Sequence, residues 1–450
     1  MIKSYALIII SFLFSLIVYS QPGFTFNEKN KHSQQVSFRL INNLIVIPLE
    51  INGKELSFIL DTGVNKTILF NLSDKDSIEL LNTTRVSLRG LGSGDAVDAI
   101  ISKENIFKVK NLISKNETVY VILKDYFDLS SKMGTTIHGI IGYNLLKNVI
   151  VKINYKTKKI NFYNPKTFTY KKCRKCETFP FQFYRKKPFI DASVSLDTVG
   201  SAFIDVKLLV DLGGSDAMWL FEKSKKSIRT PKRFFKDLLG EGLSGPIYGN
   251  RSRVSKFKMG RFVIESPTVS FLDSASTHNA RKFKERNGSV GGGILSRFKV
   301  WIDYPHKKIT LKKNGSLSAG FNYNMSGLDV VYNGKQLVKE EIVDKYKNAY
   351  NNQMPNKNSI SFVTRYSFNF KPSFIIRRVV KNSAAEKAGL LKDDIILKIN
   401  GKHAHELKIE DIIYKFQERD KKKIRITVER NGVQMKFEFR LIKKYRLNIC

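Results

Sequence analysis

The chain has 450 residues, of which 42% are hydrophobic, and it carries a formal net charge of +38. This length predicts two or three domains, and the hydrophobic content is ample for packed cores. The lysines and arginines are spread along the whole chain, and no nucleic-acid-binding motif accompanies them. We therefore expect a solvated basic surface and no nucleic-acid partner, with weak association to an anionic envelope surface as the second interpretation.

The N-terminus has the pattern of a signal peptide over residues 1–20. Lys3 provides a positive start, Ala6 to Val18 is a nearly unbroken apolar run, and Ser20 ends it. The run is short for a membrane span, and no cysteine follows it, which argues against a lipid anchor. We expect an exported protein, either periplasmic or extracellular.

A hairpin then leads to the stretch on which the interpretation depends. Asn52-Gly53 separates two apolar runs, residues 46–51 and 55–60, and such a pair predicts a tight β-hairpin. Its second strand runs into Asp61-Thr62-Gly63, so an acid lies where a buried strand leaves the core. Further strands are expected at 64–70, 99–101, 106–113 and 118–123, and Gly139 to Gly142 precedes a short helix. A hairpin of residues 149–153 and 159–163 closes this unit, the first lobe, over residues 24–166.

Much of this pattern occurs a second time. Three pairs of landmarks keep their order and a nearly constant offset: Asp61 and Asp211 (211 − 61 = 150), Gly142 and Gly291 (291 − 142 = 149), and Tyr155 and Tyr304 (304 − 155 = 149). Duplication explains such an offset. We predict a second lobe over residues 177–315.

Three cysteines are present, Cys173, Cys176 and Cys450. Cys173 and Cys176 have the spacing of a metal or redox motif, but no second pair, nearby histidine or βαβ pattern supports one. We interpret them as a local clip or as unpaired thiols between the lobes, and expect no metal.

Residues 320–445 have a different pattern. We expect a strand pair over residues 321–332, a polar insertion of low apolar content near 334–357, and a strand at 374–380. A short helix at 384–388, a strand at 393–401, a helix at 409–417 and a final hairpin of 424–430 and 434–441 follow.

The two lobes resemble aspartic peptidases of the retropepsin-like and pepsin-like kind. The resemblance rests on Asp61-Thr62-Gly63, on Ile140-Ile141-Gly142, and on a glycine-rich stretch. It implies a mainly β fold of two duplicated acid-protease-like β-barrel lobes, with Asp61 and Asp211 as the catalytic pair. Thr62, Gly63 and Gly213 would support the catalytic loops. A flap over the substrate would contain four further residues, Gly90, Leu91, Gly92 and Gly94.

The C-terminal region resembles a PDZ domain, a small α+β barrel. The evidence is Ser383 to Leu390, followed by Asp393-Asp394-Ile395-Ile396 and Ile399-Asn400-Gly401. The resemblance implies that Gly327 and Leu328 bind a peptide ligand, although the usual double glycine is missing. As a whole the chain is most similar to exported bacterial proteins that combine an aspartic peptidase region with a PDZ domain.

One departure concerns the second lobe. Leu212 stands where the aspartic peptidases have Thr or Ser, so hydroxyl bonding between the two acid loops would be one-sided. Asp211 is then either a catalytic residue or a turn residue in a lobe that only braces the first. A different alternative is that the first lobe pairs with a second copy of itself, as viral proteases do.

We therefore expect an aspartic endopeptidase that needs no cofactor and acts on a peptide or protein substrate as a monomer with intramolecular lobe pairing. The alternative is a non-catalytic peptide-binding or scaffold protein of the cell envelope with a degenerate protease fold.

Overall fold

The computed structural model describes residues 23–27, 32–72, 78–88, 95–123, 128–196, 202–242, 245–347 and 360–443. Strands make up 54% and helices 9% of the structure, so the prediction of a mainly β protein is confirmed. None of the helices in these ranges is long and apolar enough to cross a membrane. The expected signal peptide, the flap residues Gly90, Leu91, Gly92 and Gly94, and Cys450 lie outside the described residues.

The first lobe is built on a large sheet with strand order β1-β9-β6-β10-β5-β4-β8-β7, to which β3 adds beside β4. Its strands are β1 (Thr25–Phe26), β3 (Arg39–Ile41), β4 (Leu44–Ile51), β5 (Lys54–Leu60), β6 (Thr67–Leu69), β7 (Thr84–Leu88), β8 (Val97–Val109), β9 (Leu112–Ile122) and β10 (Gly139–Ile141). Two short helices, α2 (Leu129–Met133) and α3 (Tyr143–Leu146), accompany it. Helix α2 was not predicted from the sequence. One strand was predicted over residues 106–113, where the chain in fact turns between β8 and β9.

The second lobe repeats this plan with the order β18-β19-β22-β17-β23-β16-β15-β20-β21, and β14 pairs with β15. Its strands are β14 (Gln182–Tyr184), β15 (Lys187–Ser195), β16 (Ile204–Val210), β17 (Met218–Phe221), β18 (Phe235–Gly242), β19 (Gly245–Arg253), β20 (Lys256–Met259), β21 (Phe262–Glu265), β22 (Thr268–Leu272) and β23 (Arg286–Val290). Its helical turns are α4 (Ser274–Thr277), η2 (Ala280–Lys282) and α5 (Gly292–Leu295).

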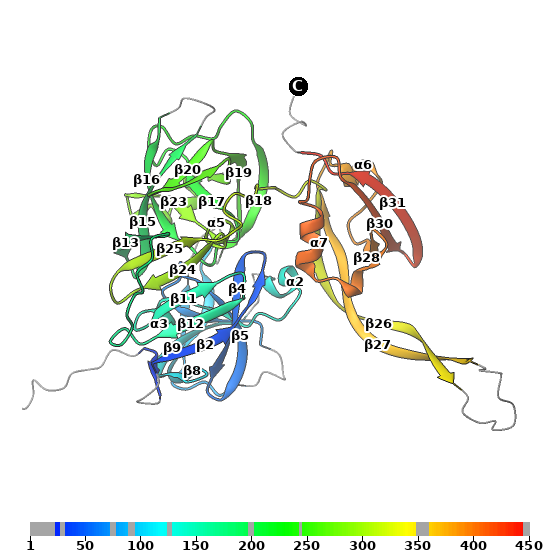
Figure 1. Ribbon diagram of the computed structural model, residues 1–450, viewed down its shortest axis with the longest axis horizontal. Coiled ribbons are helices and arrows are strands. Elements are labelled where there is room, and N and C mark those ends of the chain that lie inside the picture. The colour runs from blue at the N-terminus through cyan, green and yellow to red at the C-terminus, as the bar shows by residue number, and fades with distance from the viewer. Residues whose placement is uncertain are drawn as a thin grey trace, which may run out of the picture.

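A third sheet joins the lobes, in the order β13-β25-β24-β11-β12-β2 (Figure 1). Its strands are β2 (Ser33–Ser37), β11 (Ile150–Asn154), β12 (Lys159–Tyr163), β13 (Cys176–Pro180), β24 (Phe298–Asp303) and β25 (Lys308–Lys313). At its centre Lys152 of β11 pairs with Trp301 of β24, and the two are 301 − 152 = 149 residues apart. Because this separation equals the offset between the two repeats, Lys152 and Trp301 are equivalent residues of the two lobes, and they pair with each other. The pseudo-twofold axis between the lobes therefore passes through this pair.

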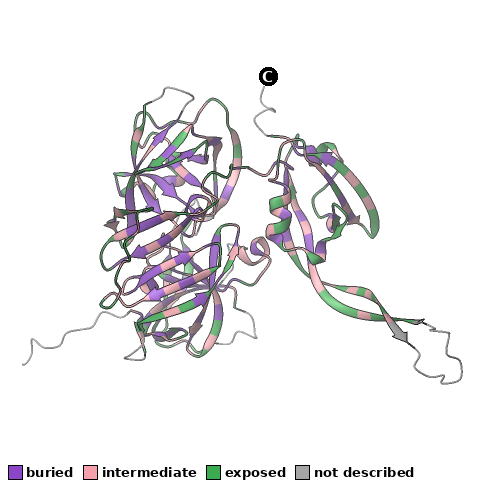
Figure 2. Ribbon diagram, viewed as in Figure 1, coloured by how far each residue is buried: buried purple, intermediate pink, exposed green. Residues whose placement is uncertain are grey.

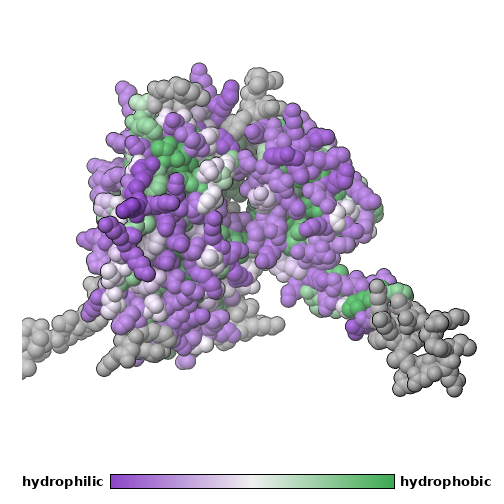
Figure 3. Space-filling model, in the orientation of Figure 1, coloured by the Kyte–Doolittle hydropathy of each residue, from purple (hydrophilic) through white to green (hydrophobic). Residues whose placement is uncertain are grey.

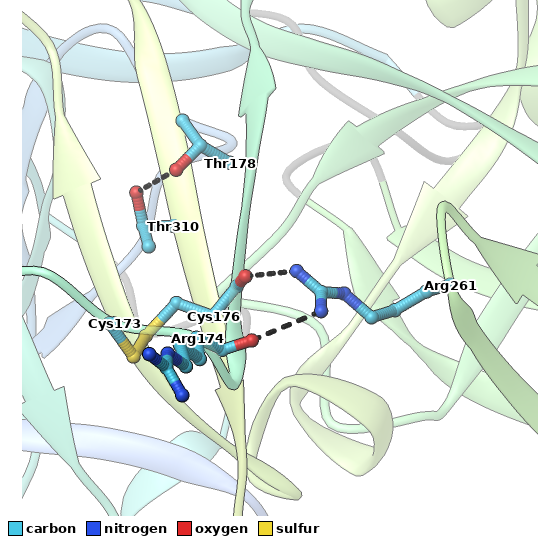
Figure 4. Close-up of a disulfide and its surroundings, with 6 residues drawn as sticks. All are labelled: Cys173, Arg174, Cys176, Thr178, Arg261 and Thr310. Atoms are coloured by element: carbon cyan, nitrogen blue, oxygen red, sulfur yellow. Dashed lines mark hydrogen bonds between the residues drawn. A yellow bond between two sulfur atoms is a disulfide. The ribbon is translucent and has the colours of Figure 1, made fainter.

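Cys173 and Cys176 form a disulfide just where β13 begins, so of the two alternatives the local clip is correct (Figure 4). Arg261 of the second lobe donates hydrogen bonds to the carbonyl oxygens of Arg174 and Cys176. The clip thus fixes the end of a strand of the shared sheet against the second lobe.

The C-terminal region forms a separate sheet with the order β26-β27-β28-β30-β31, and β29 pairs with β28. Its elements are β26 (Leu328–Lys347), β27 (Ile360–Val379), α6 (Ala384–Lys387), β28 (Ile395–Ile399), β29 (Lys402–His403), η3 (Ala404–Glu406), α7 (Ile409–Lys415), β30 (Lys423–Arg430) and β31 (Val433–Arg440).

One expectation for this region was wrong: residues 321–327 form no strand, and β26 begins only at Leu328. The described part of the expected polar insertion, residues 334–347, lies within β26, which pairs with β27 to form a two-stranded ribbon of residues 335–347 and 360–372 that projects from the domain (Figure 1). Such a ribbon needs no apolar core of its own, because its backbone hydrogen bonds are made between the two strands.

The two faces of the ribbon differ. Large apolar side chains share one face because they lie directly opposite each other or two residues apart, and all are exposed: Leu337, Tyr366, Phe368 and Phe370. Much of the ribbon is exposed in Figure 2, and Figure 3 shows hydrophobic surface on it. On the other face the charges are paired, Lys371 with Glu340 and Arg365 with Asp344. The ribbon is therefore amphipathic and has an uncovered aromatic face.

Candidate active site

Asp61 and Asp211 occupy equivalent positions, each one residue after a buried strand. β5 runs parallel to β10, and the backbone N–H of Asp61 donates to Ile141 O at 2.8 Å. In the second lobe β16 runs parallel to β23, and the N–H of Asp211 donates to Val290 O at 2.9 Å. Parallel pairing within each lobe thus fixes both acids at the edge where the lobes meet.

The structure brings the two acids together, with both carboxyl groups lying beside the backbone of Gly63. Within each loop the glycine N–H donates to the acid, from Gly63 to Asp61 Oδ1 at 2.6 Å and from Gly213 to Asp211 Oδ1 at 3.1 Å. A Cβ added at Gly63 would lie 2.9 Å from Asp61 Oδ1 and 3.3 Å from Asp211 Oδ1, and one at Gly213 would overlap the Asp61 carboxyl group. Glycine is required at both positions because the paired carboxyl groups leave no room for a side chain.

Thr62 connects the two acid loops. Its hydroxyl donates to Val210 O at 2.5 Å and accepts from the backbone N–H of Leu212 at 3.0 Å. Leu212, which replaces a hydroxyl residue, is fully buried among apolar side chains and cannot return these bonds. The bonding is one-sided, as Leu212 implied.

Burial is the main influence on both acids. Burial, together with the smaller effect of the negative charge of Asp211, raises the pKa of Asp61 to about 7. Burial also raises the pKa of Asp211, but the nearby cations Arg286 and Lys187 oppose this effect. Because two close carboxylates repel each other, the pair retains one proton to higher pH than an isolated acid would. The cations favour Asp211 as the ionised member.

The acids lie in a cleft of about 930 Å³. The second lobe contributes the β18–β19 hairpin through Leu238, Gly240 and Ile247. On the first-lobe side Ser87 and Leu88 line the cleft just before the predicted flap residues, which lie outside the described part of the chain.

The PDZ-like region forms part of the same cleft. Gly327 and Leu328 line it together with the acids. The N–H of Leu328 already donates to Ser326 Oγ at 3.0 Å, so one backbone donor of the expected ligand site is occupied.

Helix α2 of the first lobe packs against the face of this region where the sequence predicted a peptide ligand. Met133 is buried in one apolar cluster with Leu328, Val330 and Ile409, and Leu129 packs against that cluster. Arg377 of β27 donates to Asp329 beside it in the sheet and forms an ion pair of 3.2 Å with Asp128, just before α2 (the helices α2 and α7 lie side by side in Figure 1).

On the second-lobe side Arg378 reaches Asp237 of the β18–β19 hairpin, with a distance of 3.5 Å between Nη2 and Oδ1. Asp237 is in turn held by Arg251 at 2.9 Å, and Arg251 also pairs with Asp216. The C-terminal region is thus attached to both lobes at the cleft.

The sequence analysis missed Lys187, Arg286 and the contact with α2. Lys187 and Arg286 are 286 − 187 = 99 residues apart, and no motif joins them. Their meeting beside Asp211 results from the pairing of β15 and β23 with β16, which a pattern along the chain does not reveal.

Two protein families match parts of the chain. The family described as "Aspartyl protease" matches residues 47–145, which span β4 to α3 and include Asp61, and the family described as "PDZ domain" matches residues 375–430. Among solved structures, the chain is similar to the aspartic proteinase from Irpex lacteus, with 12% identity, a TM-score of 0.41, and coverage of 64% of this chain and 99% of that chain. The comparison with curated proteins found no match.

These matches cover the first acid loop and the core of the C-terminal sheet. The chain is therefore a mainly β protein that contains an aspartyl protease domain followed by a C-terminal PDZ domain.

Proposed function

We propose that the chain is an exported aspartic-type endopeptidase in which Asp61 and Asp211 form the catalytic dyad. The observation that supports this most directly is that the two carboxyl groups, one from each lobe, meet beside Gly63 in a cleft large enough for an extended peptide. The N-terminal signal pattern supports export.

In this proposal Asp211 is the base and Asp61 the acid. Lys187 and Arg286 stabilise the negative charge on Asp211, which removes a proton from the attacking water. Asp61, whose pKa is raised to about 7, keeps its proton and donates it to the carbonyl oxygen of the scissile bond. The reaction is hydrolysis: water adds across the peptide bond, and the leaving nitrogen takes a proton from the dyad.

The test is cleavage of an unfolded protein by the wild type and by the Asp61→Asn and Asp211→Asn variants. Each substitution removes one half of the proton exchange, so both should abolish cleavage, and a statine-type inhibitor should block the wild type. Asp191→Asn is the matched control, because the Asp191 side chain is 79% exposed and does not line the cleft. Full activity of Asp211→Asn would exclude the intramolecular dyad and favour pairing of two first lobes.

For the PDZ domain we propose a role in placing the substrate within the cleft. Gly327 and Leu328 line the cleft together with the dyad, and α2 packs against β26 and α7. A substrate segment that extends from the dyad along the cleft would therefore meet the loop that contains Gly327 and Leu328, and it would not have to bind the PDZ domain in a separate step.

A second role, attachment to an anionic membrane surface, is favoured by the ribbon. Phe368 and Phe370 are 61% and 69% exposed, and Lys339 lies on the same face, with its Nζ 3.7 Å from the Tyr366 ring centroid. Aromatic side chains with adjacent cations are typical of surfaces that bind at the membrane interface, and the net charge of +38 adds attraction to anionic lipid.

Co-sedimentation with vesicles that contain or lack anionic lipid tests this role. Binding to anionic vesicles should be lost in a Phe368→Ser/Phe370→Ser variant and kept in Val363→Ser, which alters the opposite face. Unchanged vesicle binding by the double variant would contradict this role. It would also be contradicted if, without vesicles, the wild type is a dimer and the double variant a monomer, because the aromatic face would then bind a second copy of the chain.

A further inference from the structure

Two cations, the half-buried Lys187 and the buried Arg286, lie in the wall of the cleft beside the dyad. Lys187 begins β15 and Arg286 begins β23, and both line the cleft. Arg286 is only 6% exposed. Its guanidinium donates to Gly288 O at 3.2 Å and to Ser289 Oγ at 2.8 Å, which are both neutral acceptors.

Neither cation forms an ion pair within the described part of the chain. A buried charge without a partner of opposite sign costs several kcal/mol, so such groups are normally paired. The dyad carries one negative charge while it shares a proton, against two positive charges from Lys187 and Arg286. The empty cleft therefore has one positive charge in excess beside the reacting groups.

The surroundings of these cations are apolar and aromatic. Tyr184 and Phe283 stack with their ring centroids 4.6 Å apart, and Phe189 meets Phe283 edge-on at 4.8 Å. All three line the cleft, and Arg286 lies over the Phe189 ring at 5.8 Å. A pocket with apolar sides and a cationic end fits a short aliphatic group that ends in a carboxylate.

We infer that Lys187 and Arg286 form a subsite for a carboxylate of the substrate, on the second-lobe side of the scissile bond. The inference rests on the proposed function and names the substrate class: peptides with a carboxylate next to the cleaved bond. Binding of that carboxylate compensates the excess charge and replaces the lost hydration of the cations. Arg185 and Lys282, which also line the cleft, add positive potential that attracts acidic peptides.

The carboxylate could come from a glutamate or aspartate side chain or from the C-terminus of the peptide. The first source gives an endopeptidase that cuts beside acidic residues, and the second gives an enzyme that removes short C-terminal fragments. The same set of peptides distinguishes them.

The experiment uses the full chain and a peptide taken from a cleaved unfolded protein. Each position near the cleaved bond is changed in turn to Glu or to Gln, and every peptide is made with a free and with an amidated C-terminus. We expect kcat/KM to favour Glu over Gln by on the order of tenfold or more at one position, as for a charged hydrogen bond made at a buried site. A preference for the free over the amidated end alone would identify the terminal carboxylate as the ligand.

Lys187→Met should reduce this preference to near one. Lys207→Met is the matched control, since Lys207 lies in the same lobe but pairs with Asp191 at 2.7 Å and does not line the cleft. Calorimetric binding of the same peptides to Asp61→Asn gives a readout that does not require catalysis. Equal cleavage of all peptides would overturn the subsite and leave the proposed function intact. If no unfolded protein is cleaved, the proposed function is refuted. The subsite is then tested by calorimetric binding of synthetic Glu and Gln peptides with free and amidated C-termini, and equal affinities for all of them would refute it.

Discussion

The hydroxyl of Thr62 accepts a 3.0 Å hydrogen bond from the backbone N–H of Leu212, and by this contact the first lobe holds the acid loop of the second. The same hydroxyl donates to Val210 O. Thr62 is fully buried, so water cannot replace either bond. Since Leu212 has no hydroxyl, Thr62 alone makes the side-chain hydrogen bonds between the two acid loops, which two equivalent hydroxyl residues would otherwise share.

Thr62→Val should therefore weaken both the fold and the site. It leaves a buried carbonyl and a buried N–H without partners, which costs about 1–3 kcal/mol each in comparable cases. We expect a lower urea midpoint and a large loss of kcat. Thr62→Ser keeps the hydroxyl and is the control, and equal stability of the Val and Ser variants would contradict this role.

Cleavage should be strongest at mildly acidic pH. The dyad works with one proton, and because the pKa of Asp61 is about 7, that proton is lost as the pH rises through about 7. At low pH Asp211 takes up a proton and no longer acts as the base. We predict a bell-shaped profile of kcat/KM against pH, and activity that keeps rising above pH 8 would be inconsistent with a shared proton.

Stability should depend on pH through the same group. The pKa of Asp61 is raised on folding from 3.8 to about 7, so the folded state binds the proton more tightly than the unfolded state. The contribution of the Asp61 proton to the free energy of unfolding is complete below about pH 4, declines as the pH rises, and is gone above about pH 7. Urea midpoints measured across this range should decline more steeply for the wild type than for Asp61→Asn, and parallel curves would exclude the raised pKa.

Gly213→Ala should disable the site without a general loss of structure. Its Cβ would overlap the Asp61 carboxyl group, and a displacement of about 1 Å at a catalytic group costs on the order of a hundredfold in rate. Gly240→Ala is the control for stability, because a Cβ there meets no atom within 4 Å. Wild-type kcat for Gly213→Ala would show that the carboxyl groups tolerate displacement.

The PDZ domain should detach from the first lobe in Met133→Asp. Met133 is 2% exposed within the cluster that it shares with Ile409, and a buried carboxylate there would have no partner of opposite charge on the adjoining apolar side chains. Small-angle X-ray scattering should report a larger radius of gyration. Met133→Leu conserves volume and should keep the wild-type radius, whereas an unchanged radius in Met133→Asp would place the attachment elsewhere.

Much of the fold could be predicted from local patterns. Asn52-Gly53 between apolar runs predicted the hairpin that ends at Asp61, and the structure has β4 and β5 there. The constant offset predicted two similar lobes. Near residues 334–357 the low apolar content predicted a polar insertion but gave no conformation for it. The alternation of Tyr366, Phe368 and Phe370 was the available signal for a strand.

By itself the sequence determined the two acid loops, their glycines and the repeat, because strand alternation, turn residues and duplicated spacing are local properties of a chain. Only the tertiary structure decided that Lys187 and Arg286 lie beside Asp211, and that α2 packs against the PDZ domain. Those contacts join residues that are far apart in the chain and separated by different intervals. They depend on which strands pair and which surfaces pack, and burial then sets the charge balance of the cleft.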